Sequence, residues 1–138
     1  PAPAANYVPY VQVGSTLYVS GQISNGPDGL IIGKLGDGMS VEAGAAAAKT
    51  CAISPLAQVK AACGGDLSKV KQIVKVGGFV CADPKNTDLD IPKIINGCSD
   101  LFVDVFGDAG RHARFAVGAP SLPRDCAVEI DCVVEITN

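Results

Sequence analysis

The segment from Cys126 to Thr137 has the strictest residue pattern in the chain and constrains the fold more than any other feature. Every second residue is apolar, and charged residues occupy several of the positions between them. Successive side chains of a β-strand point to opposite faces of a sheet, so this alternation predicts a strand with one buried and one polar face. The apolar positions are Cys126, Val128, Ile130, Cys132, Val134 and Ile136, and the charged ones are Glu129, Asp131 and Glu135.

Two segments with helical periodicity are predicted to cover such a sheet. In residues 40–63 apolar side chains recur at helical spacing, and Ser40 is suited to cap the first turn. Pro55 lies inside this segment, and we expect a kink or a broken turn there because proline lacks a backbone N–H. Residues 90–106 carry a single apolar stripe and end at a glycine. Each helix therefore has one face to bury against the sheet.

The remaining strands are predicted from runs of β-branched and aromatic residues between turn signals. Gly77-Gly78 interrupts one of these runs and indicates a bulge or a close backbone approach. The order is βββ-α-β-α-ββ, which predicts one α+β domain over residues 1–138, with six strands and both helices on one sheet face. The runs are residues 7–13, 16–22, 30–32, 70–81 and 113–119.

Charge and composition exclude several classes of function. The net charge is −3 and the basic residues are scattered, which argues against a nucleic-acid binder because such proteins neutralise phosphates with Lys and Arg. The six cysteines form no C-x-x-C pair and fall in apolar patterns, so we expect buried free thiols. With one histidine, no metal site is implied. The apolar fraction of 48% suggests that some surface is hidden in an oligomer.

The location is expected to be cytoplasmic. Residues 1–6 carry neither the positive n-region nor the apolar h-region of a secretory signal. No apolar run is long enough to span a bilayer.

Arg114 is the first candidate site residue, because it lies in a short apolar strand. A guanidinium matches the planar geometry of a carboxylate and can bind it through two parallel hydrogen bonds. The alternative is an ion pair with Asp131 or Glu129 on a neighbouring strand, which from the residues alone is the stronger interpretation.

Glu129 is a second candidate, as a general base, although on the residue pattern alone the polar face of a half-exposed strand is the stronger interpretation. The glycine-rich segments match no phosphate-binding motif and are interpreted as turns. Ser20-Gly21-Gln22 lacks the nucleophile-elbow pattern of a serine hydrolase. His112 has no nearby nucleophile and is expected at the surface or at a helix end.

Three stretches together resemble the Rid family, also called the YjgF family or reactive intermediate deaminases. They are AVGAPSLPRDCAVEI at 116–130 with Arg114 just before it, PYVQVGSTLYVSGQI at 9–23, and INGCSDLFVDVFGDAGRHAR at 95–114. The last stretch is similar to a divergent subgroup. The resemblance implies a chorismate-mutase-like α+β fold and a homotrimer with clefts between subunits.

The resemblance also implies a chemistry without metal or organic cofactor, namely hydrolysis of enamines and imines such as 2-aminoacrylate and 2-iminopropanoate to 2-oxo acids and ammonium. Arg114 is similar to the arginine that holds the substrate carboxylate, and Glu129 to the glutamate that positions and activates water. Tyr10, Gly21, Asn96 and Ala116 match further substrate-binding positions.

Three residues depart from the family pattern. Phe115 stands where a small residue is common, Ala116 replaces a frequent cysteine, and His112 replaces a small residue or proline. These changes bear on pocket volume and substrate choice. The sequence therefore predicts an imine deaminase, with a non-catalytic trimeric binder of small 2-oxo or amino carboxylates as the main alternative. A ribonuclease is disfavoured by the acidic charge.

Overall fold

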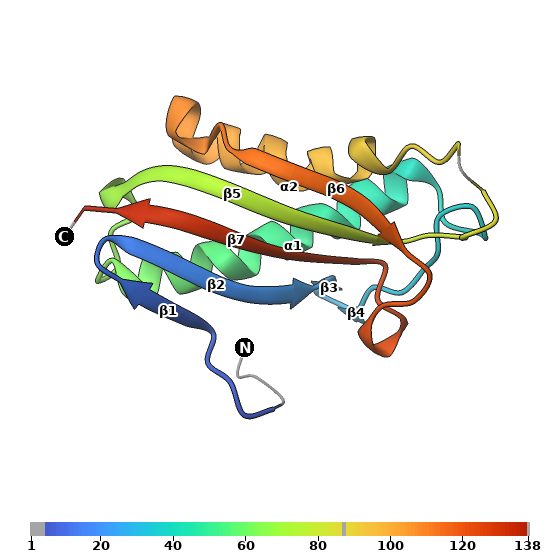
Figure 1. Ribbon diagram of the computed structural model, residues 1–138, viewed down its shortest axis with the longest axis horizontal. Coiled ribbons are helices and arrows are strands. Elements are labelled where there is room, and N and C mark those ends of the chain that lie inside the picture. The colour runs from blue at the N-terminus through green and yellow to red at the C-terminus, as the bar shows by residue number, and fades with distance from the viewer. Residues whose placement is uncertain (1–4, 87, 138) are drawn as a thin grey trace.

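The computed structural model describes residues 5–86 and 88–137. Its main feature is a five-stranded sheet in the order β1-β2-β7-β5-β6, with helices α1 and α2 on one side (Figure 1). The strands of this sheet are β1 (Tyr10–Val13), β2 (Thr16–Ile23), β5 (Val70–Cys81), β6 (Ala113–Ala119) and β7 (Val128–Ile136), and the helices are α1 (Val41–Ala62) and α2 (Ile91–Phe106). Short 3-10 turns are η1 (Leu67–Lys69), η2 (Gly107–Gly110) and η3 (Pro123–Asp125).

Strand β7 lies at the centre of the sheet, antiparallel to both β2 and β5. Its even-numbered residues are buried beneath the helices, and its odd-numbered residues face the other side, so the predicted alternation is confirmed. Strands β5 and β6 are parallel, and α2 forms the crossover between them. Strand β6 is therefore an edge strand with α2 beside it.

The predicted six-stranded sheet is wrong by one strand, because residues 30–32 do not join it as a strand. Asn25–Gly26 (β3) and Gly29–Leu30 (β4) instead pair with each other as a separate two-stranded hairpin. Ile32 forms an isolated antiparallel bridge with Cys126 and is not part of a named strand. The turn at residues 27–28 reverses the chain directly after β3, which leaves β4 paired locally.

The two helices pack closely because glycines lie at their contact. A Cβ atom on Gly97 of α2 would overlap the backbone of Ala45 on α1, and a Cβ on Gly44 would lie 2.5 Å from Ile94 Cδ1. Ser40 caps α1 as predicted, accepting a hydrogen bond of 3.1 Å from the Ala43 backbone N–H. The broken turn expected at Pro55 does not occur, since α1 is continuous through that residue.

The glycine pair Gly77-Gly78 in β5 marks a close approach of neighbouring residues, which is one of the two alternatives predicted from the sequence; the other was a bulge. A Cβ on Gly77 would overlap Asp131 and the Phe115 ring, and one on Gly78 would overlap Ile95 of α2. The register shifts of β5 against β7 lie earlier in the strand, between Val70 and Lys75.

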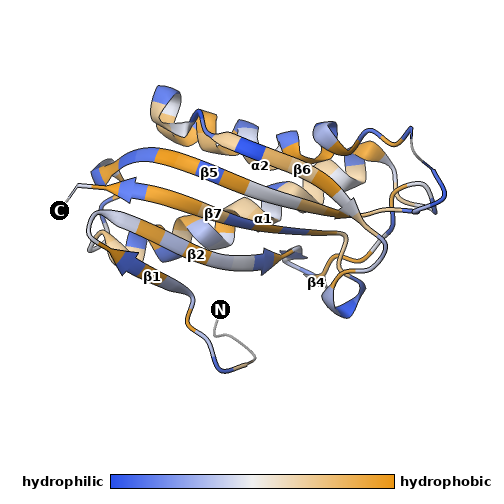
Figure 2. Cartoon of the chain, viewed as in Figure 1, coloured by the Kyte–Doolittle hydropathy of each residue, from blue (hydrophilic) through white to orange (hydrophobic). Residues whose placement is uncertain are grey.

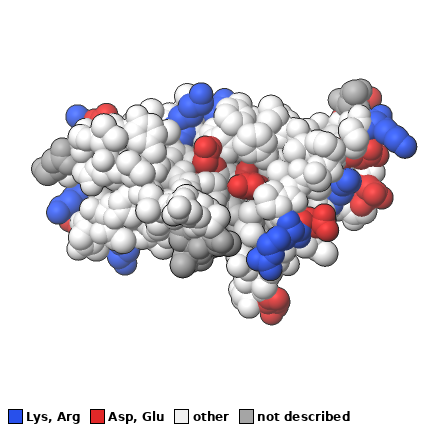
Figure 3. Space-filling model, turned by 60° about the horizontal axis from the view of Figure 1, so that its bottom comes forward, with Lys and Arg blue, Asp and Glu red and all other residues white. Residues whose placement is uncertain are grey.

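The sheet face opposite the helices, here called the open face, carries exposed apolar side chains. Apolar residues occur along all its strands (Figure 2), and an oblique space-filling view shows a mainly uncharged surface with two acidic groups near its middle (Figure 3). By strand register the open face includes Val11, Val13, Tyr18, Phe115 and Val117, all of them exposed. All six cysteines are free and buried, as predicted. Within the described ranges no helix has the length and apolar character to cross a membrane.

Candidate functional site

Arg114 lies on the edge strand β6 and points toward the helices. It pairs in register with Val76, which is fully buried beneath them. Its guanidinium donates two hydrogen bonds to α2, from Nη1 to Ser99 Oγ at 3.1 Å and from Nη2 to the Pro92 carbonyl oxygen at 3.3 Å. The Arg114 side chain is half-buried. Both hydrogen-bond partners are neutral, so they do not compensate its positive charge.

The sequence-based alternative of an ion pair with Asp131 or Glu129 is wrong. Both carboxylates extend from odd-numbered positions of β7 and lie on the open face, whereas Arg114 is on the helix side. In the described part of the chain the ion pairs are Lys71–Glu135, Lys93–Asp90 and Arg111–Asp108, and none includes Arg114.

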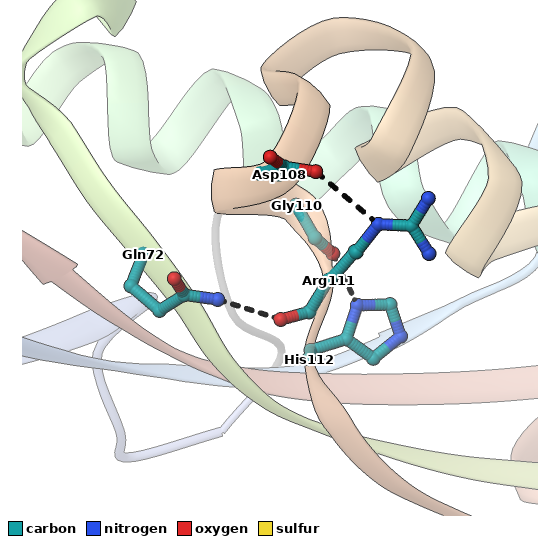
Figure 4. A network of polar contacts seen from close by, with 5 residues as sticks. All are labelled: Gln72, Asp108, Gly110, Arg111 and His112. Atoms are coloured by element: carbon teal, nitrogen blue, oxygen red, sulfur yellow. Dashed lines mark hydrogen bonds and ion pairs between the residues drawn. The ribbon is translucent and has the colours of Figure 1, made fainter.

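His112 extends the hydrogen bonds of Arg114. Its Nε2 lies 2.8 Å from Ser99 Oγ. Its Nδ1 lies 2.7 Å from the Gly110 carbonyl oxygen, a contact drawn in Figure 4. The ring also contacts Phe102 edge-on. His112 follows directly on η2, in agreement with the expected helix-end position, but it is half-buried and not a surface side chain. Burial lowers its pKa, the charge of Arg114 lowers it further, and the bond to Gly110 opposes both.

Two further predicted residues lie on the same elements as this group. Asn96 shares a face of α2 with Pro92 and Ser99, because residues three and four apart are neighbours on a helix. Ala116 shares the face of β6 that carries Arg114, and it packs against the core. We call Arg114, Ser99 and His112 the arginine cluster, and Asn96 and Ala116 flank it.

Glu129 lies in a cavity of about 720 Å³ between the end of β2, α1 and the β6–β7 connection. Burial raises the pKa of its carboxyl group, and the charge of Asp131 adds to the rise. Gly21 provides the room for this carboxylate, since a Cβ there would lie 2.5 Å from Glu129 Oε2. We call this space the glutamate cavity; its lining includes Tyr7, Gly21, Thr50, Ser54, Arg124 and Glu129.

Tyr10 is not among the residues that line the glutamate cavity. It pairs with the buried Val19 and packs against the core, while Tyr7 and Pro9 reach the cavity from the same segment. The single chain thus brings Glu129 and Gly21 together and Arg114, Asn96 and Ala116 together, but it separates the two groups. Arg114 does not line the glutamate cavity.

Sequence reasoning missed four of these side chains. Ser99 could have been found from its spacing to Asn96 on one helix face. Thr50 and Ser54 are polar residues four positions apart in an otherwise apolar segment, so they could have been predicted to share one face of α1. Arg124 had no such signal, because its left-handed backbone (φ 56°) arises in η3, within the connection between two strands.

The described residues contain no group of three or more His, Cys, Asp or Glu side chains that could hold a metal ion. The fold and the two groups of residues define an α+β protein with an uncompensated arginine at one sheet edge and a half-buried glutamate in a cavity elsewhere.

Comparisons with known proteins agree with this class. Residues 1–136 match the family described as "YjgF/chorismate_mutase-like, putative endoribonuclease". Protein TCP17 of Trypanosoma cruzi is 47% identical, over 99% of this chain and 85% of that protein. The crystal structure of Atu1372 from Agrobacterium tumefaciens, a protein of unknown function, superposes with a TM-score of 0.91 at 46% identity, covering 99% of this chain and 87% of that one.

A more distant structure carries the Rid name. RidA from the Antarctic bacterium Psychrobacter sp. PAMC 21119 is 25% identical with a TM-score of 0.63, and the match covers 99% of this chain and 93% of that chain. The protein belongs to the YjgF/chorismate-mutase-like family, and its two helices packed on one sheet are the fold of that family.

Proposed function

We propose that this protein hydrolyses small enamines and imines that carry a carboxylate, releasing 2-oxo acids and ammonium. The observation that carries the proposal is the Arg114 guanidinium, which is half-buried and, within the described residues, hydrogen-bonded to two neutral groups, the Ser99 hydroxyl and the Pro92 carbonyl. A guanidinium has five N–H donors, so donors remain for a substrate carboxylate. Each charged hydrogen bond of this kind contributes roughly 1.5–3 kcal/mol.

Glu129 is the proposed general base. A half-buried carboxylate with a raised pKa accepts a proton from water more readily than an exposed one. The water oxygen then bonds to the imine carbon while its proton passes to Glu129. Transfer of protons to the nitrogen lets the C–N bond break, so that 2-iminopropanoate and water give pyruvate and ammonia, which is ammonium at neutral pH. The imine is already electrophilic, so orientation and a placed water suffice.

The proposed active unit is a homotrimer, because one chain keeps Arg114 and Glu129 apart. The exposed apolar side chains of the open face favour association with further copies. In such an assembly the arginine cluster of one subunit would face the glutamate cavity of the next, with Tyr10, Gly21, Asn96 and Ala116 around the substrate. The buried free thiols suit a cytoplasmic location, where thiols stay reduced.

The test is turnover of freshly generated 2-aminoacrylate, followed as ammonium or pyruvate. The wild-type protein should accelerate release, and Arg114→Ala should abolish the acceleration. Lys93→Ala, which removes an exposed cation of α2 paired with Asp90, is the matched control and should be fully active. An Arg114→Ala variant as active as wild type would refute the assignment.

A non-catalytic carboxylate binder is the second candidate, because the arginine cluster is complete within one chain without Glu129. It predicts that Glu129→Gln binds pyruvate as wild type does and that neither form turns over imines. The word endoribonuclease in the family description raises a third activity. Salt-sensitive RNA cleavage that is lost in Arg114→Ala would be needed to support it, against a net charge of −3.

A further inference from the structure

We propose that Ser99 and His112 are positioning residues for Arg114, and that anion binding at Arg114 is coupled to proton uptake by His112. This inference rests on the proposed function only in taking Arg114 as the site of a carboxylate. Neither residue touches the reacting atoms in the proposed mechanism. Both act through the guanidinium.

The hydrogen bonds of the arginine cluster have one consistent direction. The Gly110 carbonyl oxygen can only accept, so His112 Nδ1, 2.7 Å away, must carry the proton. In the neutral ring Nε2 then has the lone pair and accepts from the Ser99 hydroxyl at 2.8 Å. The oxygen of that hydroxyl keeps its lone pairs for Arg114 Nη1, which donates to it at 3.1 Å.

This chain of bonds fixes the guanidinium without neutralising it. Ser99 Oγ receives one nitrogen, and the Pro92 carbonyl oxygen receives the other at 3.3 Å. Two anchors on one helix define the plane of the group, which lowers the entropy lost when a carboxylate binds. A carboxylate in place of Ser99 would also fix the guanidinium, but it would neutralise the positive charge that binds a substrate carboxylate.

Protonation of His112 conflicts with this arrangement. It would place a second donor, Nε2–H, against Ser99 Oγ and turn the serine hydrogen away from the ring. It would also place a positive charge beside Arg114, which lowers the pKa of His112 in addition to burial. An anion bound to Arg114 cancels that repulsion, so His112 should take up a proton more easily.

Among the described residues, the groups that contact the His112 ring from the neighbouring elements are uncharged. Helix α2 presents the Ser99 hydroxyl and the edge of Phe102, and η2 presents the Gly110 carbonyl. Arg111 and Asp108 form an exposed ion pair with each other, and Gln72 of β5 donates to the Arg111 carbonyl oxygen (Figure 4). Arg114 is therefore the charge to which His112 responds.

The experiment is an NMR titration of the imidazole, which is unambiguous because the sequence has one histidine. In the ligand-free protein the neutral ring should be protonated at Nδ1. Saturating pyruvate, used as the carboxylate probe, should raise the pKa of His112 by about 0.5 or more. By linkage, pyruvate should bind more tightly as the pH falls through that pKa.

Substitutions at Ser99 and His112 distinguish a positioning role toward Arg114 from a general contribution to folding. Ser99→Ala should weaken pyruvate binding and raise KM by about 10-fold or more, as expected for loss of one hydrogen bond to a charged group. Ser99→Thr keeps the hydroxyl and should restore most of the affinity. His112→Gln offers a non-titrating acceptor, so it should bind pyruvate with little dependence on pH.

The possible failures are distinguishable. An Nε2-protonated neutral ring, or a His112 pKa unchanged at saturating pyruvate, would overturn the coupling. Wild-type affinity and KM in Ser99→Ala would overturn the positioning role, even if deaminase activity were present. If pyruvate raises the pKa of His112 as predicted but the protein releases no ammonium from imines, the proposed deaminase activity is contradicted and the coupling of His112 to anion binding is supported.

Discussion

Single residues set the chemistry of the glutamate cavity. Gly21 faces the Glu129 carboxylate across neighbouring strands, and no larger residue fits there without moving that group. The carboxylate keeps a raised pKa because it is partly buried and lies near Asp131. The alternation of β7 was sufficient to predict the sheet face of Glu129. It could not predict the cavity, because α1 and the β6–β7 connection come from distant parts of the chain.

Replacing Gly21 tests this placement. Gly21→Ala should lower kcat for 2-aminoacrylate by about 10-fold or more, because the displaced carboxylate no longer positions water. Gly14→Asn is the matched control: Gly14 has open space and a left-handed backbone that Asn tolerates. Equal loss in both variants would point to damaged folding of the hairpin instead.

The pH dependence of turnover tests the protonation state of Glu129. Its raised pKa means that the carboxyl group is protonated, and inactive as a base, at pH values where an ordinary glutamate is already ionised. The rate should therefore fall with decreasing pH through a midpoint above the ordinary value. Asp131→Asn should move this midpoint to lower pH by removing the neighbouring charge. A midpoint that Asp131→Asn leaves in place would contradict this cause.

At the level of elements, the pairing of β5 with β6 decides what Arg114 can do. The sequence predicted both strands, but their parallel register puts Arg114 opposite the buried Val76 and on the helix side. A shift by one residue would have turned it to the open face, toward the acidic groups of β7. Local patterns do not encode such a register, and for this reason the ion-pair interpretation failed.

The contact of α1 with α2 gives a test whose sign is informative. An alanine is intrinsically better in a helix than glycine by about 1 kcal/mol. Gly97→Ala should nevertheless destabilise the protein by about 1–3 kcal/mol, because its Cβ would overlap the backbone of Ala45. Gly44→Ala should cost less, since it meets the flexible end of Ile94. Denaturant unfolding measures both, and stabilisation by Gly97→Ala would contradict the packing described.

At the scale of the whole molecule, the proposed function needs a second subunit, because one chain keeps Arg114 and Glu129 apart. The resemblance to the Rid family predicts such an arrangement of subunits, whereas composition predicts only that some apolar surface is hidden in an oligomer. The open face carries such an apolar surface. The sequence pattern did not predict that Phe115 and Val117 belong to it, because in β6 the residues of both faces are largely apolar. Phe115 packs edge-on against Phe79 at a centroid distance of 5.4 Å, so its side chain lies on the sheet.

The proposed homotrimer can be tested by a substitution on the open face. Tyr18→Glu places a charge on an exposed apolar position there and should convert a trimer of the 14.0 kDa chain into smaller species. Val105→Glu, an exposed apolar position on α2, is the matched control and should not change the mass. Sedimentation equilibrium measures the difference. A trimer retained in Tyr18→Glu would contradict association through this face.

The claim on which the account depends is that the Arg114 guanidinium is free to bind a carboxylate. Calorimetric titration with pyruvate, comparing wild type with Arg114→Lys, tests it most directly. Lysine keeps the charge but lacks the planar fork, so the affinity should fall by about 10-fold or more. Equal affinity in the two proteins, or no binding to wild type at millimolar pyruvate, would contradict the account.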